Sequence, residues 1–121
     1  MRNVAIGILL SAGFASFAVS AEDDVMAGFY GNTAVGTGGR VDTHTAYFPD
    51  HTFDTKVPAL GLEFKGTWKL TGATLCRLYE TPPPDVPNPF CTPIEAHKVG
   101  DTWTVTLNGQ SRTITLVKGI Q

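Results

Sequence analysis

The sequence has few cysteines and histidines, which limits the metal and redox chemistry open to it. Its 121 residues include Cys76, Cys91, His44, His51 and His97, with no Cys-x-x-Cys or His-x-x-x-His spacing. A protein metal centre needs three or four such ligands in a defined geometry. A three-histidine site would require the fold to gather three separate segments. The sequence therefore predicts no metal and no other cofactor.

An excess of positive charge is also missing. Nine Lys and Arg residues stand against eleven Asp and Glu residues, and the basic residues form no cluster. Binding to nucleic acid needs several cations on one face, so the sequence does not predict it. A Gly-x-Ser-x-Gly nucleophile motif is absent. The glycines at 36, 38 and 39 lack the Lys-Ser/Thr of a phosphate loop and predict a turn.

The start of the chain has the three parts of a secretory signal peptide. Arg2 precedes an apolar run over residues 4–10, and small residues lead to Ala21, which is followed by an acidic stretch. We predict a signal peptide over residues 1–21 and one domain over residues 22–121. The apolar run is shorter than the roughly 20 residues of a membrane helix. The expected location is therefore periplasmic or secreted, without a membrane anchor.

An oxidising compartment favours a disulfide between Cys76 and Cys91. The alternative, a metal site, matches poorly because two thiols supply half of a usual ligand set. A prolyl-rich stretch over residues 81–90 lies between the two cysteines. Because proline lacks the amide donor, this stretch is expected to be a stiff loop outside the sheet interior.

Apolar residues in the rest of the chain recur at every second position, which is the period of half-buried strands. Hairpin turns are indicated at Asn108-Gly109 and at Pro49-Asp50-His51. Gly66 lies within a strand and marks a bulge or a bend. Strands are expected at residues 31–37, 40–48, 52–57, 60–70, 74–80, 94–98, 102–107 and 112–118.

Short connections between these strands predict an all-β fold. We expect a small antiparallel up-and-down meander of roughly seven or eight strands, closed or nearly closed into a lipocalin-like barrel with one disulfide. Closing the sheet would remove edges that invite aggregation. An open sandwich is the alternative.

Two short patterns carry a resemblance to known proteins. The run Phe64-Lys65-Gly66-Thr67-Trp68 resembles the Gly-x-Trp strand of lipocalin-like and avidin-like barrels, which implies a ligand cavity. The wider pattern, which adds Tyr47-Phe48-x-Asp50 and Leu75-Cys76, is similar to small exported bacterial proteins of uncharacterised role. That second likeness implies the architecture and no activity.

The first functional hypothesis is a binding protein for an apolar or weakly anionic small molecule. Arg77 and Arg112 each share a strand face with apolar residues, and an arginine in an apolar pocket can bind a carboxylate. The alternative is that their charged ends reach water at the ends of strands. Tyr79, Trp68 and Trp103 are further candidates for ligand contact, although aromatic residues also fill small cores.

The second hypothesis is a cofactor-free lyase or isomerase. Asp42 and His44 share one strand face, and a carboxylate beside a histidine can orient a general base, with Tyr47 as a further participant. The opposite face, which carries Thr43 and Thr45, is equally able to be the core side.

The third hypothesis is an envelope protein-interaction or protease-inhibitor module. Its docking surface would be the loop from Pro82 to Phe90, within residues 81–93, because a stiff, tethered loop loses little entropy on binding. The alternative is that this loop covers one end of the barrel.

Overall fold

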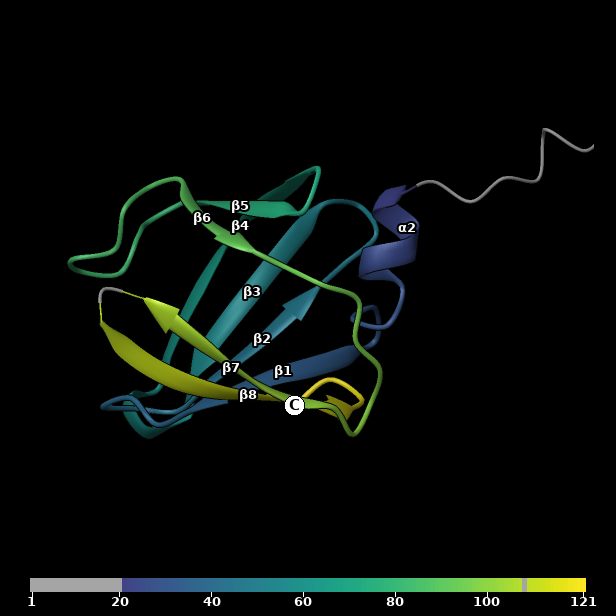
Figure 1. The fold of residues 1–121 in the computed structure, drawn as a ribbon. Helices are drawn as coiled ribbons and strands as arrows, with labels where there is room; N and C mark the ends of the chain where they lie inside the picture. Colours follow the sequence, from purple (N-terminus) through teal and green to yellow (C-terminus); the bar gives the residue numbers. More distant parts are fainter. Residues whose placement is uncertain (1–20, 108) are drawn as a thin grey trace, which may run out of the picture.

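A computed structural model describes residues 21–107 and 109–121. The predicted signal peptide lies outside the described residues except for Ala21. The described chain forms one short helix and eight strands, and the strands make up a single curled sheet (Figure 1). The elements are α2 (Ala21–Met26), β1 (Asn32–Thr37), β2 (Thr43–Tyr47), β3 (Thr52–Val57), the 3-10 turn η1 (Pro58–Leu60), β4 (Leu62–Thr71), β5 (Thr74–Tyr79), β6 (Phe90–Pro93), β7 (Thr102–Leu107) and β8 (Gln110–Lys118).

All eight strands belong to one antiparallel sheet with the order β6-β5-β4-β3-β2-β1-β8-β7. The predicted antiparallel meander is confirmed, and the sandwich alternative is wrong. Figure 1 shows the sheet curling strongly, so that its two outer strands, β6 and β7, come to lie on either side of the enclosed space. The result is a half-barrel whose edges are not hydrogen-bonded to each other.

The hairpin between β2 and β3 sets which side chains face inward. Asp50 accepts hydrogen bonds from the backbone N–H of Thr52 at 3.0 Å and from its hydroxyl at 2.6 Å, which holds the turn. This turn pairs Tyr47 with Phe53 and Thr45 with Thr55. On β3 the buried residues alternate with the more exposed ones, so one face of the sheet is inner and the other meets water.

One predicted strand was wrong. The sixth strand covers Phe90–Pro93, whereas residues 94–98 form no strand. The reason is cross-strand pairing, because Cys91 lies directly opposite Cys76 on β5. The predicted disulfide between these cysteines is confirmed. Such a bond is typical of an oxidising, extracytoplasmic environment, and no helix within the described chain is long and apolar enough to span a membrane.

The prolyl-rich loop is attached to the sheet by the side-chain amide of Asn88, which makes the two hydrogen bonds that a paired strand residue would make. The backbone N–H of Tyr79 donates to Oδ1 of Asn88 at 2.8 Å, and Nδ2 of Asn88 donates to the Tyr79 carbonyl at 3.1 Å. These two bonds extend the β5–β6 pairing two residues beyond the Arg77↔Phe90 pair, where the prolines on both sides of Asn88 could not supply backbone donors. The loop itself stays outside the strands, as predicted.

Gly66 marks a close approach and not a bulge. The β4 register continues unbroken through Phe53↔Gly66 on one side and Gly66↔Tyr79 on the other. A Cβ atom at this position would collide with the Leu78 carbonyl and approach the Phe53 ring. A residue without a side chain is therefore required where the Leu78 carbonyl and the Phe53 ring come this close to β4.

A cluster of buried side chains lies at the end of the half-barrel near α2. Met26 and Phe29 are buried there, and Trp68 is 2% exposed. The indole N–H of Trp68 donates to the Phe48 carbonyl at 3.0 Å, and the His51 ring stacks on the indole with centroids 4.1 Å apart. Nε2 of His51 lies 2.7 Å from a carboxylate oxygen of Glu22, which joins α2 to the sheet.

We predict that Trp68→Ala lowers the free energy of unfolding by about 3 to 5 kcal/mol, because a buried indole is replaced by a cavity. Such a loss is a large part of the roughly 5 to 15 kcal/mol typical of a domain. Urea denaturation followed by far-UV circular dichroism measures it. His44→Ala is the control, since His44 lies on the outer face. Equal losses in the two variants would contradict this account of the core.

For the disulfide, we predict no titratable thiol in the denatured, unreduced protein. Replacing both cysteines by serine should lower the free energy of unfolding by about 3 kcal/mol, the chain-entropy value for a loop of this size. Thiol titration and urea denaturation provide the two measurements. Two reactive thiols in the untreated protein would rule out the bond as a stabilising element.

Candidate functional site

The curled sheet encloses a cavity of about 640 Å³. Residues of all eight strands contribute to its wall, so the cavity exists only when the whole sheet is assembled. Its surface is mostly apolar, with a few polar groups among the apolar side chains. The apolar and aromatic lining residues include Phe29, Ala34, Tyr47, Val57, Phe64, Leu75, Tyr79, Val86, Phe90, Ile94, Trp103, Val105, Leu107 and Ile114.

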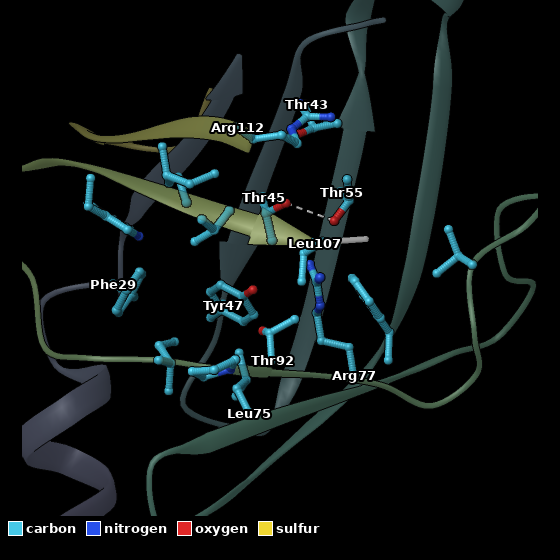
Figure 2. Close-up of a pocket in the computed structure, with 18 of the residues that line it drawn as sticks. Phe29, Thr43, Thr45, Tyr47, Thr55, Leu75, Arg77, Thr92, Leu107 and Arg112 are labelled. Carbon is cyan, nitrogen blue, oxygen red and sulfur yellow. Dashed lines mark hydrogen bonds between the residues drawn. The ribbon is translucent and has the colours of Figure 1, made fainter. Parts of the chain in front are cut away.

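The strand β2 turns its threonine and tyrosine face into this cavity. Thr43, Thr45 and Tyr47 all line it, and the buried hydroxyls of Thr45 and Thr55 are hydrogen-bonded at 2.9 Å (Figure 2). His44 instead lines a separate outer depression with Lys56. The structure therefore separates His44 from Tyr47, on opposite faces of one strand.

This separation bears on the acid–base hypothesis. Asp42 is exposed just before β2, and no hydrogen bond joins it to His44 among the described residues. A general base must lie within reach of its substrate's proton, and the enclosed cavity contains Tyr47 but not His44. The predicted trio of Asp42, His44 and Tyr47 is consequently not assembled around one space.

Arg77 is placed on the inner face of β5, between the buried side chains of Leu75 and Tyr79. Figure 2 shows its side chain extending into the enclosed space. The guanidinium carbon lies 5.1 Å from the centroid of the Phe90 ring and 5.9 Å from the centroids of Phe53 and Tyr79. Three aromatic rings thus surround a cation that faces an apolar cavity.

The guanidinium of Arg77 contacts aromatic rings, but one of its N–H groups has no hydrogen-bond acceptor in the described part of the chain. Its Nε is buried and has no hydrogen-bond partner among the described residues. No ion pair of Arg77 with a carboxylate is present among them either. A buried donor left without an acceptor costs roughly 1 to 3 kcal/mol. The Nε of Arg77 is therefore buried on the inner face of β5, although the residue as a whole is half-buried.

Arg112, by contrast, has a structural partner. It lines the other part of the cavity wall from β8, where its Nη2 donates to the Val41 carbonyl at 3.1 Å. A Cβ atom at Gly36 or Gly39 would crowd the guanidinium. The glycine-rich stretch predicted as a turn consequently also makes room for Arg112, which fastens the β1–β2 connection to β8.

A stacked aromatic cluster forms the end of the cavity beside α2. The rings of His97 and Trp103 are parallel, with centroids 3.5 Å apart, and Phe29 meets both edge-on at 6.2 Å. Nδ1 of His97 lies 3.3 Å from a carboxylate oxygen of Asp101. The chain between β6 and β7 can approach this closely because residue 28 is glycine, since a side chain there would collide with the His97 carbonyl.

The predicted ligand-contact residues fall into two groups. Arg77, Tyr79, Trp103 and Arg112 line the cavity, whereas Trp68 belongs to the packed core and does not line it. Burial raises the pKa of the Tyr79 hydroxyl, so this group stays protonated. The sequence reasoning did not single out several lining residues, among them Phe29, Thr45, Thr55, Val105 and Leu107.

The prolyl-rich loop contributes to the cavity wall. Pro83, Val86 and Phe90 line the cavity, and Val86 and Phe90 pack against the core cluster. The three histidines lie in three separate places, and no group of three metal-ligating side chains forms within residues 21–107 and 109–121. The arrangement can therefore hold a small molecule with an apolar body, and two arginines, Arg77 and Arg112, lie in the cavity wall.

Taken together, the fold and site define a class: an eight-stranded antiparallel half-barrel with one disulfide and an interior, mainly apolar cavity. No protein-family model, no curated protein and no solved structure matches this chain.

Asp101 supplies a prediction about stability and pH. The backbone N–H of Lys98 and the His97 ring both bond its carboxylate and lower its pKa below the usual value. A lowered folded pKa gives stability that is present above the unfolded pKa of about 3.9 and lost as the pH falls through the folded pKa. We expect Asp101→Asn to flatten this loss of stability below about pH 4.

Urea denaturation at several pH values between neutral and strongly acidic conditions tests this expectation. Asp42→Asn is the matched control, because Asp42 is an exposed carboxylate without a hydrogen-bond partner among the described residues. Parallel acid limbs for the wild type and Asp101→Asn would show that the turn around Asp101 contributes nothing to acid stability.

Proposed function

We propose that this protein is an exported binding protein that holds a small apolar or weakly anionic molecule inside its half-barrel. The observation that carries the proposal is the cavity of about 640 Å³ with a mainly apolar wall. Ligand sites in proteins are typically clefts of about 300 to 1,000 Å³ lined by apolar and aromatic groups with few polar ones. The disulfide supports the periplasmic or secreted location.

The shape of the sheet supports binding over a purely structural role for this space. A small closed barrel of eight strands is usually filled by its own side chains. Here β6 and β7 end the sheet without pairing with each other, and both contribute to the cavity wall. We therefore expect a molecule to enter between these unpaired edges without unfolding of the domain.

The two other hypotheses receive less support. An acid–base enzyme would need His44 inside the cavity, whereas it lies on the outer face. The loop from Pro82 to Phe90 forms part of the cavity wall, which accounts for its attachment to β5 without a protein partner. No contact among the described residues favours the alternative that this loop binds an envelope protein.

The test uses N-phenyl-1-naphthylamine, an uncharged apolar dye whose fluorescence rises when it leaves water. We expect the wild type to bind the dye and Val105→Trp to bind it at least about tenfold more weakly, because the added ring occupies the cavity. Val105 is half-buried on β7 and lines the cavity. Fluorescence titration measures the dissociation constants.

Leu78→Trp is the matched control, because it adds the same ring on the outer face, where Leu78 is 52% exposed. This variant should bind the dye as the wild type does. Absence of dye binding by the folded wild type would refute the proposed function. Equal binding by Val105→Trp and Leu78→Trp would show that the dye binds elsewhere.

A further inference from the structure

The proposed function leaves the charge of the ligand open, and Arg77 bears on it. Arg77 is the cavity-lining residue whose buried donor, Nε, no described residue accepts. Its three aromatic neighbours contact the guanidinium group at centroid distances of 5.1 to 5.9 Å. Aromatic rings stabilise the positive charge, but they offer no acceptor in the plane of the N–H groups. The donors therefore remain available to a molecule in the cavity.

The other charged groups of the wall do not compete for this role. Arg112 donates to the Val41 carbonyl and is enclosed by Gly36 and Gly39. Glu95 is the carboxylate among the lining residues, and it is exposed and forms no ion pair with Arg77. Among the cations of the cavity wall, Arg77 thus has neither a carboxylate counter-ion nor a carbonyl acceptor within the described part of the protein, whereas Arg112 is bonded to the Val41 carbonyl.

A single guanidinium matches a monoanion. Its planar fork of donors suits the two oxygens of a carboxylate, which it can bind through two parallel hydrogen bonds. A phosphate monoester carries more charge, and a second free cation would be expected to neutralise it. The remaining wall, with Leu75, Trp103 and Leu107, suits an apolar body.

Several hydroxyl groups lie in the same part of the cavity as Arg77. Thr45 and Thr55 bond to each other on the floor of the cavity, and Tyr47 lies next to Thr45 on the same inward face. Figure 2 shows these residues and Arg77 around one part of the cavity, with Phe29 farther toward α2. The cavity thus has one part that contains the Arg77 guanidinium and several hydroxyl groups, and another that contains Phe29 and Trp103.

We infer that the ligand is an amphipathic monocarboxylate whose carboxylate binds the guanidinium of Arg77 while its apolar body lies against the aromatic end of the cavity. This inference rests on the proposed function, because it requires a molecule inside the half-barrel. It also accounts for a buried donor that the described protein itself leaves unpaired. No covalent step is involved.

The experiment compares octanoate with 1-octanol, two probes with the same chain length and different head groups. Each probe is titrated as a competitor of bound N-phenyl-1-naphthylamine, and its dissociation constant is determined for the wild type, Arg77→Met, Arg77→Lys and Arg40→Met. We expect the wild type to prefer octanoate by about tenfold. Arg77→Met should reverse the preference, because an apolar site disfavours a hydrated carboxylate.

The remaining variants separate charge from geometry. Arg77→Lys should keep part of the preference, since it retains the charge and loses the fork. Arg40→Met should behave as the wild type, because it removes the same charge from an exposed position. Thermal unfolding of each unliganded variant shows that it is folded, and Arg77→Met should melt no lower than the wild type.

The outcomes distinguish the proposed function from the inference that the ligand is a monocarboxylate. A wild type that does not bind the dye refutes the proposed function and this inference together. A wild type that binds the dye and prefers octanol, or shows no preference, overturns the inference and leaves the proposed function standing. An octanoate preference that persists in Arg77→Met also overturns it, because another residue would then hold the carboxylate.

Discussion

The disulfide between Cys76 and Cys91 is the constraint on which the cavity wall depends. The strand β6 has four residues, ends in a proline and pairs with β5 alone. A strand so short and so poor in donors has little hydrogen bonding to keep it in place. The cross-strand bond fixes its register, and the Asn88 side chain extends the pairing as far as Tyr79.

The register of β6 in turn decides what surrounds Arg77. Phe90 lies opposite Arg77 across the β5–β6 pair and supplies the nearest of its three rings. Leaving β6 unattached would remove this ring and part of the cavity wall. The same bond that stabilises the small domain therefore also shapes the environment of Arg77.

The two ends of the half-barrel differ in how they are closed. Near α2, buried Met26 and Phe29 complete a dense aromatic cluster with Trp68 and Tyr47. At the edges of the sheet, no described strand pairs with the outer sides of β6 and β7, and both strands line the unfilled cavity. Stability and the capacity to hold a ligand are thus supported by different parts of one sheet.

Much of the fold could be predicted from local patterns. The alternation along β4, the turn around Asp50 and the paired cysteines indicated an antiparallel sheet with one disulfide, and these features are local. The alternation along β2 does not by itself show which of its two faces points inward, but the turn centred on Asp50 pairs Thr45 with Thr55. Since Asp54 and Lys56 mark the wet face of β3, that register would have placed Tyr47 inside and His44 outside.

The sequence alone therefore determined the strand content, the hairpin turns and the disulfide, because each depends on neighbouring residues or on a scarce residue type. Only the tertiary structure decided that Phe90–Pro93 and not residues 94–98 forms the edge strand, since β5 selects its partner. It likewise decided that Arg77 faces an enclosed space while Arg112 is bonded to Val41. Such differences arise from how far the sheet curls, which brings together segments distant in sequence.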